Sequence, residues 1–169
     1  MIQKKVNMLG AFAVGKTSLV QRYVSSLFSD KYQTTVGVTI KKRVLKVDEQ
    51  DVTLVIWDQM GEDEFQWMQT VHIKGAAGFM LVLDGTRRAT LDVAIGIEER
   101  VKTEIGPLPF IAVINKTDLK AQWDITEADI DAMKARGWSV FQGSAKSGEG
   151  VEAAFEMLAR RAIDFPLRS

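Results

Sequence analysis

Residues 10–18 read Gly-Ala-Phe-Ala-Val-Gly-Lys-Thr-Ser, and this stretch decides how the rest of the chain is interpreted. It fits the pattern G-x-x-x-x-G-K-[ST], and a short apolar segment, Val6 to Leu9, precedes it as the pattern requires. The two glycines let the backbone turn tightly and bring successive N–H groups close to phosphate oxygens at the start of a helix. The stretch therefore predicts a strand, a phosphate-binding loop and a helix, with a nucleoside triphosphate and magnesium as ligands.

Two side chains of this loop carry the expected chemistry. Lys16 supplies a mobile positive charge for the β- and γ-phosphates, and Thr17 offers a hydroxyl oxygen to Mg²⁺, which prefers hard oxygen ligands. The alternative is that two glycines simply make a turn before a helix. The strand candidate before the loop and the helical pattern after it disfavour that alternative.

Composition limits the class of protein. The 169 residues suit one domain, here residues 1–169, and the 22 basic residues balance the 22 acidic ones, which argues against nucleic acid as a partner. The chain has no cysteine, which excludes disulfides, thiolate catalysis and a lipid anchor carried on cysteine. It begins Met-Ile-Gln-Lys-Lys, without a signal peptide, and has no apolar run of membrane-spanning length, so we expect a cytoplasmic protein.

Short apolar runs alternate with helix-period segments along the chain. Strands are expected at 5–9, 38–47, 52–58, 78–84, 110–115 and 139–142, and helices at 16–25, 63–71, 91–105, 127–135 and 151–163. A hairpin at 48–51 joins the second and third strands, and helices make the other crossovers. This order predicts an α/β protein with the three-layer fold of P-loop NTPases, a six-stranded, mostly parallel sheet with one antiparallel edge strand, and about five helices.

A base-reading element follows the strand expected at 110–115. Asn115-Lys116-Thr117-Asp118 lies where open α/β sheets bind their ligands. The Asp118 carboxylate can accept from two adjacent N–H groups on the edge of guanine, whereas adenine lacks that pair of donors. Lys116 could cover one face of the base, and Asn115 could tie the loops together. The alternative is an ordinary turn, since all four residue types are tolerated in turns.

A second element about 30 residues further on supports the first. Gly143-Ser144-Ala145-Lys146 follows another short strand, and its backbone N–H groups could reach the base oxygen. This element is weak evidence by itself. Together with the phosphate loop and the Asn-Lys-Thr-Asp stretch, it favours a guanine nucleotide.

Three residues between the first helix and the short helix candidate could act near the γ-phosphate. Asp58 ends a strand and can hold Mg²⁺ through a water molecule, and Gly61 can bring its N–H to the γ-phosphate. Thr35, in the polar loop before the second strand, could complete the magnesium shell. Without the other motifs, the simpler interpretation would be that Asp58 and Gly61 match Asp-x-x-Gly by chance and that Thr35 is an ordinary loop residue.

With these residues in place, the chain resembles a Ras-type small GTPase and is most similar to the Rab-like and prokaryotic Ras-like branches. The resemblance implies a switch that hydrolyses GTP to GDP with Mg²⁺ and presents residues 30–39 and 59–74 to effector, exchange and activating proteins. The residues that it places around the nucleotide are Gly10, Ala13, Val14, Gly15, Lys16, Thr17, Ser18, Phe28, Tyr32, Thr35, Asp58, Gly61, Asn115, Lys116, Asp118, Ser144, Ala145 and Lys146. It assigns catalysis to Lys16, Thr35, Gly61 and Glu62, and magnesium binding to Thr17, Thr35 and Asp58.

The chain departs from this family at Glu62, where most relatives have a glutamine that orients the attacking water. A carboxylate cannot donate a hydrogen bond to water, and it adds negative charge beside the γ-phosphate, so we expect slow unaided hydrolysis. Alternatively, Glu62 could act as a general base for the attacking water and so support hydrolysis. A guanine-nucleotide-binding module with negligible hydrolysis is the competing function, and an ATP-dependent kinase is a third, disfavoured by Asp118.

Other departures concern partners. Phe12 stands where relatives have a small residue, so its ring should obstruct an activating protein's arginine, and Gln33 stands where a cis-acting arginine would lie. The aromatic triad through which Rab-type relatives bind effectors corresponds here to Ile40, Trp57 and His72. Effector identity and oligomeric state are not determined by the sequence.

Overall fold

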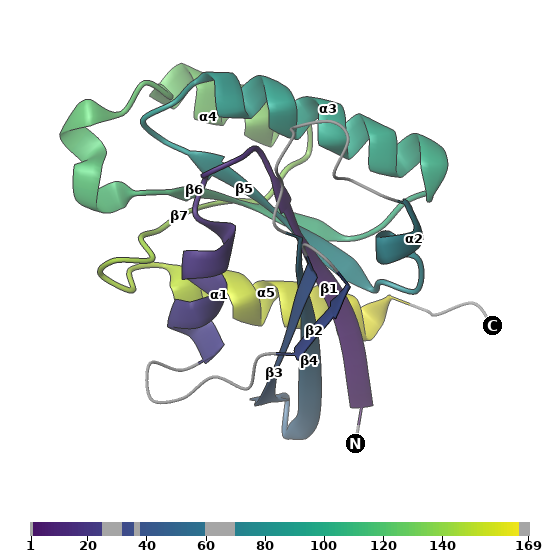
Figure 1. Ribbon diagram of the computed structural model, residues 1–169. Helices are drawn as coiled ribbons and strands as arrows, with labels where there is room; N and C mark the ends of the chain where they lie inside the picture. Colours follow the sequence, from purple (N-terminus) through teal and green to yellow (C-terminus); the bar gives the residue numbers. More distant parts are fainter. Residues whose placement is uncertain (1, 25–31, 36–37, 60–69, 166–169) are drawn as a thin grey trace.

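The structure, a computed structural model, describes residues 2–24, 32–35, 38–59 and 70–165. A seven-stranded sheet forms the middle layer, in the order β2-β3-β4-β1-β5-β6-β7 (Figure 1). The strands are β1 (Ile2–Gly10), β2 (Tyr32–Thr35), β3 (Val38–Val47), β4 (Gln50–Gln59), β5 (Gly78–Asp84), β6 (Phe110–Asn115) and β7 (Val140–Gln142). The α-helices in these ranges are α1 (Lys16–Val24), α2 (Thr70–Ile73), α3 (Ala89–Glu104), α4 (Glu127–Ala135) and α5 (Val151–Asp164), and a 3₁₀-helix, η1, spans Thr117–Gln122.

The predicted α/β class is confirmed. β1 pairs in parallel with β4 and β5, and β5, β6 and β7 continue the parallel sheet. Helices α1 and α5 cover one face, and α3 and α4 cover the other, as Figure 1 shows. Four elements have the predicted bounds, namely β3, β5, β6 and α4.

The edge of the sheet differs from the prediction. β3 is the antiparallel strand, but the short β2 pairs antiparallel with residues 38–40 of β3 and so adds a seventh strand outside it. β2 was not predicted because its sequence, Tyr-Gln-Thr-Thr, has no apolar alternation. Of the helix predicted at 63–71, the structure describes only a short helix, α2, at Thr70–Ile73, and residues 63–69 lie outside the described ranges.

The β3–β4 hairpin is tighter than the four-residue turn that we expected. Val47 pairs with Gln50, so only Asp48 and Glu49 form the turn, with φ values of 50° and 65°. Positive φ at both central residues matches the right-handed twist of the flanking strands. The turn thus sets the register that runs the full length of β3 and β4.

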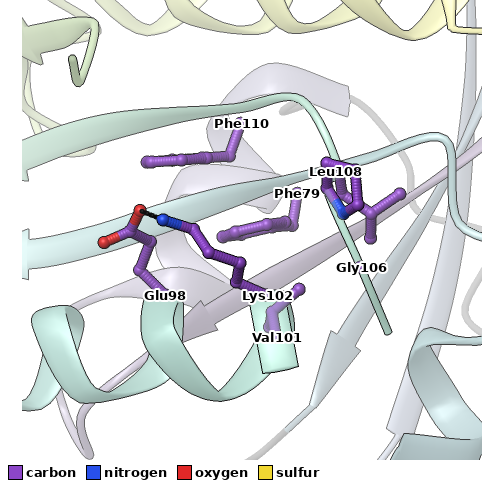
Figure 2. Close-up of a pocket in the computed structure, with 8 residues that line it drawn as sticks. Phe79, Glu98, Val101, Lys102, Gly106, Leu108 and Phe110 are labelled. Carbon is purple, nitrogen blue, oxygen red and sulfur yellow. Dashed lines mark ion pairs between the residues drawn. The ribbon is translucent and has the colours of Figure 1, made fainter. Parts of the chain in front are cut away.

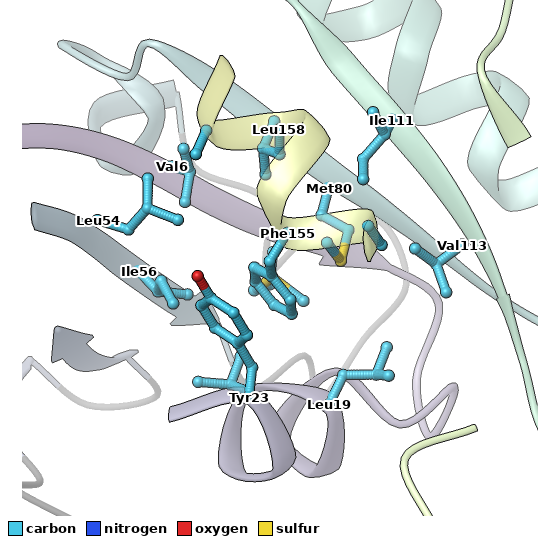
Figure 3. Close-up of a cluster of buried hydrophobic side chains, with 14 of the residues drawn as sticks. Val6, Leu19, Tyr23, Leu54, Ile56, Met80, Ile111, Val113, Phe155 and Leu158 are labelled. Atoms are coloured by element: carbon cyan, nitrogen blue, oxygen red, sulfur yellow. The ribbon is translucent and has the colours of Figure 1, made fainter. Parts of the chain in front are cut away.

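Two apolar cores lie on either side of the sheet. In the first, Figure 3 shows α1 and α5 converging on the strands, with Tyr23 stacked on Phe155 at 4.0 Å between ring centroids. In the second, α3 and α4 bury Ile97 and Ile130 against β5 and β6. β5 is buried along its whole length, as expected for a central parallel strand covered on both faces. No helix within the described ranges has the length and apolar character needed to cross a membrane.

Candidate nucleotide-binding site

The predicted loops meet at one end of the sheet. The site lies where β1, β5 and β6 end, at Gly10, Asp84 and Asn115, and beside Asp58, the penultimate residue of β4. Parallel strands bring their carboxyl ends to the same edge, where open α/β sheets bind ligands. Residues far apart in the sequence therefore lie together at this edge of the sheet.

The phosphate loop needs its glycines for close approach. A Cβ on Gly10 would lie 2.5 Å from the carbonyl oxygen of Val82, and one on Gly15 would collide with the side-chain amide of Asn115. Gly15 also has a φ of +102°, which favours glycine. Ala13 adopts a φ of 62°, unusual for a residue with a Cβ, so the surrounding structure must support the loop.

Side chains hold the carbonyl groups of the phosphate loop. Lys16 donates from Nζ to the carbonyl oxygens of Gly10 and Ala11 at 3.0 and 3.1 Å. Asn115 donates from Nδ2 to the carbonyl oxygen of Val14 at 3.0 Å. With its carbonyls engaged by the protein, the loop can direct N–H groups toward an anion.

Lys16 is buried although it carries a charge. Its side chain is 5% exposed, and burial lowers its pKa to about 8, while the nearby carboxylate of Asp58 acts in the opposite direction. An anion placed against Nζ would stabilise the ammonium form. A phosphate group bound here would therefore favour the charged form of Lys16.

Thr17 and Asp58 form a hydrogen-bonded pair of oxygen groups. The Thr17 hydroxyl donates to Oδ2 of Asp58 at 2.6 Å, and the carboxylate is 2% exposed. Burial raises the pKa of Asp58, opposed by the Thr17 hydrogen bond and by the charges of Lys16 and Lys41. Oδ1 of Asp58 accepts no hydrogen bond within the described part of the chain. A buried carboxylate oxygen of this kind, beside a hydroxyl, fits the hard oxygen ligands that Mg²⁺ prefers.

Asn115 links three loops, as the sequence suggested. In addition to its bond to Val14, its Oδ1 accepts from the backbone N–H of Ala145 at 3.1 Å, and the side chain is 2% exposed. The phosphate loop, the loop after β6 and the loop after β7 are thus fixed relative to one another.

Asp118 lies at the start of η1, at the surface beside the loop after β7. The hydroxyl of Ser144 donates to its Oδ1 at 2.7 Å, and Ser144 in turn accepts from the N–H of Ser147 at 3.1 Å. We expected Ser144 to act through its backbone, and the structure adds a side-chain role in orienting the Asp118 carboxylate. Sequence reasoning missed this bond because it joins residues 26 positions apart.

Asp84 was also missed. This fully buried carboxylate ends β5 and pairs with Nζ of Lys116 at 2.7 Å. Burial alone would raise its pKa, but the hydrogen bonds from Lys116 and Thr86, together with the Lys116 charge, hold the pKa below its usual value. The signal that could have found it is its position, since Asp84 is the register partner of Asn115 at the ends of adjacent strands.

Several predicted residues are described in part or not at all. Phe28, Gly61 and Glu62 lie outside the described ranges, and Tyr32 and Thr35 belong to β2, of which the structure describes the backbone. Ala13, Ser18 and Lys146 are exposed at this end of the molecule. Phe12 is 56% exposed, so its ring stands at the surface of the phosphate loop.

The predicted triad forms one surface region. Ile40 and Trp57 are register partners on β3 and β4, and the rings of Trp57 and His72 lie 6.4 Å apart. Lys5 places Nζ 3.8 Å from the centre of the Trp57 ring. The structure therefore brings the three positions together, with a positive charge beside them.

A separate pocket lies at the opposite end of the sheet. Figure 2 shows the stacked rings of Phe79 and Phe110, near the starts of β5 and β6, with the ion pair of Glu98 and Lys102 at the side. Its volume is about 130 Å³, well below the several hundred Å³ of typical ligand sites. It is neither part of the nucleotide region nor large enough for a nucleotide.

The fold and the loops at this edge of the sheet define a P-loop nucleotide-binding protein. The Ras family model matches residues 5–164. The chain is 32% identical to the Ras-related protein Rab-7b of Mus musculus, over 96% of this chain and 83% of that protein. It is 33% identical to the GTP-binding protein yptV5 of Volvox carteri and 32% identical to the Ypt/Rab-type GTPase ypt7 of Pyricularia oryzae, in each case over 94% of this chain and 82% of the relative. The chain therefore belongs to the Ras family, and it is a GTPase.

Proposed function

We propose that residues 1–169 form a single G domain that binds GTP with Mg²⁺, hydrolyses it slowly when unaided, and signals its nucleotide state to partner proteins. The observation that carries the proposal is the hydrogen bond of 2.6 Å between the exposed Thr17 hydroxyl and the buried carboxylate of Asp58, with the buried ammonium of Lys16 nearby. A site that combines oxygen ligands for a cation with a desolvated positive charge suits a metal-bound polyphosphate.

The magnesium ion would be held by Thr17 and Thr35, and by Asp58 through a water molecule. Bound Mg²⁺ neutralises charge on the β- and γ-phosphates. The open Oδ1 of Asp58 supports this assignment, because a buried carboxylate oxygen without a hydrogen bond is costly unless another group satisfies it.

Lys16 would exchange its carbonyl partners for phosphate oxygens. In the free protein, Nζ donates to Gly10 and Ala11, and these bonds keep the ammonium hydrogen-bonded while it is buried. A phosphate offers a full negative charge in place of two neutral acceptors, so the ammonium gains a Coulombic attraction that the carbonyl oxygens do not provide. Lys16 would thus stabilise charge as the γ-phosphate leaves.

Asp118 would select guanine. Ser144 holds Oδ1 of the carboxylate, and this contact supports a fixed orientation toward the base. The remaining acceptor sites of an ionised carboxylate suffice for two adjacent N–H groups, since each oxygen has two lone pairs. Adenine has no such pair of donors, so ATP is expected to bind poorly.

Glu62 would make unaided hydrolysis slow, because it cannot donate a hydrogen bond to the attacking water. The exposed ring of Phe12 supports the further proposal that an activating protein cannot insert an arginine in the usual place. An activator would instead reposition Glu62 or Gln59. Residues 30–39 and 59–74 would present the nucleotide state to partners, and His72 of the second range forms a surface with the adjacent Ile40 and Trp57.

The test is single-turnover phosphate release from GTP by the native protein and by Glu62→Gln, with and without Mg²⁺. We expect slow, Mg²⁺-dependent release from the native protein and a faster rate in the variant, because the amide both donates and accepts. Equal rates would refute a role for position 62. GTP binding without measurable release over hours would favour the competing function, a guanine-nucleotide-binding module with negligible hydrolysis.

A further inference from the structure

An arginine outside the sequence motifs contacts the phosphate loop. Arg87 follows β5, and its Nη1 donates to the carbonyl oxygen of Phe12 at 2.9 Å. Along the chain, Phe12 follows Gly10 and Ala11, whose carbonyls bond Lys16, and precedes Val14, whose carbonyl bonds Asn115. Arg87 thus adds a third side-chain support to the loop, from a different strand end.

The same arginine is connected to the base-reading loop. Its Nη1 lies 3.8 Å from Oδ2 of Asp84, the oxygen that pairs with Nζ of Lys116 at 2.7 Å. The other oxygen of Asp84 accepts from the N–H and the hydroxyl of Thr86 at 2.9 and 2.7 Å. The buried carboxylate therefore orients both the loop that carries Arg87 and the lysine of the base-reading loop.

We propose that Arg87 is a positioning residue for the nucleotide, which holds the Phe12 carbonyl away from the phosphates and, through Asp84, joins the phosphate loop to Lys116. The inference rests on the proposed function, because it assumes that the loop binds phosphate. It adds a determinant of nucleotide affinity that lies outside the predicted motifs.

The backbone conformation explains why the loop needs this support. Ala13, the residue after Phe12, has a φ of 62°, which costs energy in a residue with a Cβ. The bond to Arg87 fixes the peptide group between the two residues, because it holds that carbonyl. The N–H of Ala13 belongs to the same peptide plane and points the opposite way, so fixing the carbonyl directs that N–H toward the anion.

Arginine is suited to this position. Its planar guanidinium has five N–H donors in a fixed arrangement, so one side chain can bond a carbonyl and face a carboxylate together. A lysine could satisfy one partner but not hold the same geometry with both. Arg87→Lys should therefore retain only part of the effect.

Arg88 provides a matched control. It is the neighbouring residue, but it pairs with Asp129 at 2.9 Å, at the N-terminus of α4. Arg88→Gln removes the same charge from the same loop, and the Arg88 side chain bonds Asp129 rather than the phosphate loop. Arg87 and Arg88 are 40% and 52% exposed, so neither substitution opens a cavity in the core.

The experiment measures dissociation of a fluorescent GDP analogue from the native protein, Arg87→Gln, Arg87→Lys and Arg88→Gln, with equilibrium competition by GDP and GMP. We expect Arg87→Gln to release the analogue about tenfold faster, Arg87→Lys to be intermediate, and Arg88→Gln to match the native protein. Because Arg87 acts on the loop that cradles the phosphates, Arg87→Gln should weaken GDP more than GMP. Since its bond exists before nucleotide arrives, KM for GTP should rise while kcat is unchanged.

Two results would overturn the inference. One is a dissociation rate for Arg87→Gln equal to that of Arg88→Gln, and the other is an equal loss of affinity for GDP and GMP. Failure of the proposed function would look different, because the native protein itself would then not retain the GDP analogue. Thermal unfolding of the nucleotide-free proteins checks that the variants are folded.

Discussion

Asn115 donates from Nδ2 to the carbonyl oxygen of Val14 at 3.0 Å, although 101 positions separate the two residues. The same amide accepts from Ala145, so one buried side chain connects three loops that sequence analysis could only treat separately. The phosphate loop and the base-reading loops are therefore mechanically coupled through Asn115.

Replacing this amide should destabilise the protein and impair nucleotide binding together. In Asn115→Ala, the carbonyl of Val14 and the N–H of Ala145 lose their partners, and each buried unpaired group costs about 1–3 kcal/mol. We expect the free energy of unfolding to fall by about 2–4 kcal/mol in urea titrations of the nucleotide-free protein. Asn115→Asp keeps the acceptor for Ala145 but turns a carboxylate oxygen toward the Val14 carbonyl, so it should destabilise the protein as well. A native unfolding midpoint for Asn115→Ala would contradict the coupling.

Nucleotide affinity should depend on pH through Lys16. Burial lowers its pKa to about 8 in the free protein, so the ammonium loses its proton above that pH. Phosphate favours the charged form, so binding above pH 8 takes up a proton, and affinity falls by at most about tenfold per pH unit. Calorimetric titrations with GDP between about pH 7 and 9, in buffers of different ionisation enthalpy, measure this uptake. In Lys16→Met, the uptake should disappear, and its persistence there would assign it to another group.

Base selectivity should depend on Asp118. ITP lacks the exocyclic amino group of GTP, so it removes one of the two donors that the carboxylate can accept. We expect the native protein to prefer GTP over ITP by roughly 10- to 100-fold, the size of one charge-assisted hydrogen bond. Asp118→Ala should bind the two nucleotides almost equally, and Ser144→Ala should show a smaller loss of preference. Competition titrations measure the ratio of the two affinities. An undiminished preference for GTP over ITP in Asp118→Ala would exclude recognition of guanine by this carboxylate.

The stacked pair of Tyr23 and Phe155 should dominate the stability of the first core. Phe155 is fully buried, and its removal leaves a cavity between α1, α5 and the sheet (Figure 3). Phe155→Ala should cost about 3–5 kcal/mol of unfolding free energy, and Phe155→Leu considerably less. Glu156→Ala, on the exposed side of α5, should change stability by at most about 0.5 kcal/mol. Urea denaturation of the three variants tests the order.

Elements with strong local patterns were predicted from the sequence. The bounds of β5 and β6 follow from uninterrupted apolar runs, and α4 begins where Thr126 and Asp129 form a reciprocal cap. The short β2 lacks such a pattern, and its pairing depends on the adjacent β3. Local sequence therefore defines the central strands well and the sheet edge poorly.

In the candidate site, too, residues in local sequence motifs were predicted and their distant partners were not. The phosphate loop and the base-reading stretch carry local motifs, so Lys16, Thr17, Asn115 and Asp118 could be named in advance. The partners of these motifs could not, because Asp84 and Arg87 reach the site through strand register rather than through spacing along the chain. Neither residue belongs to a recognisable pattern, and only the three-dimensional arrangement relates them to the phosphate loop.

The position of β1 at the centre of the sheet has a consequence for motion. β4, whose penultimate residue is Asp58, lies on one side of β1, and β5, which ends in Asp84, lies on the other. Residues 6–10 of β1 are buried throughout. Under the proposed function, we therefore expect a rearrangement beside Asp58 to leave β1 in place and the base-reading loops undisturbed.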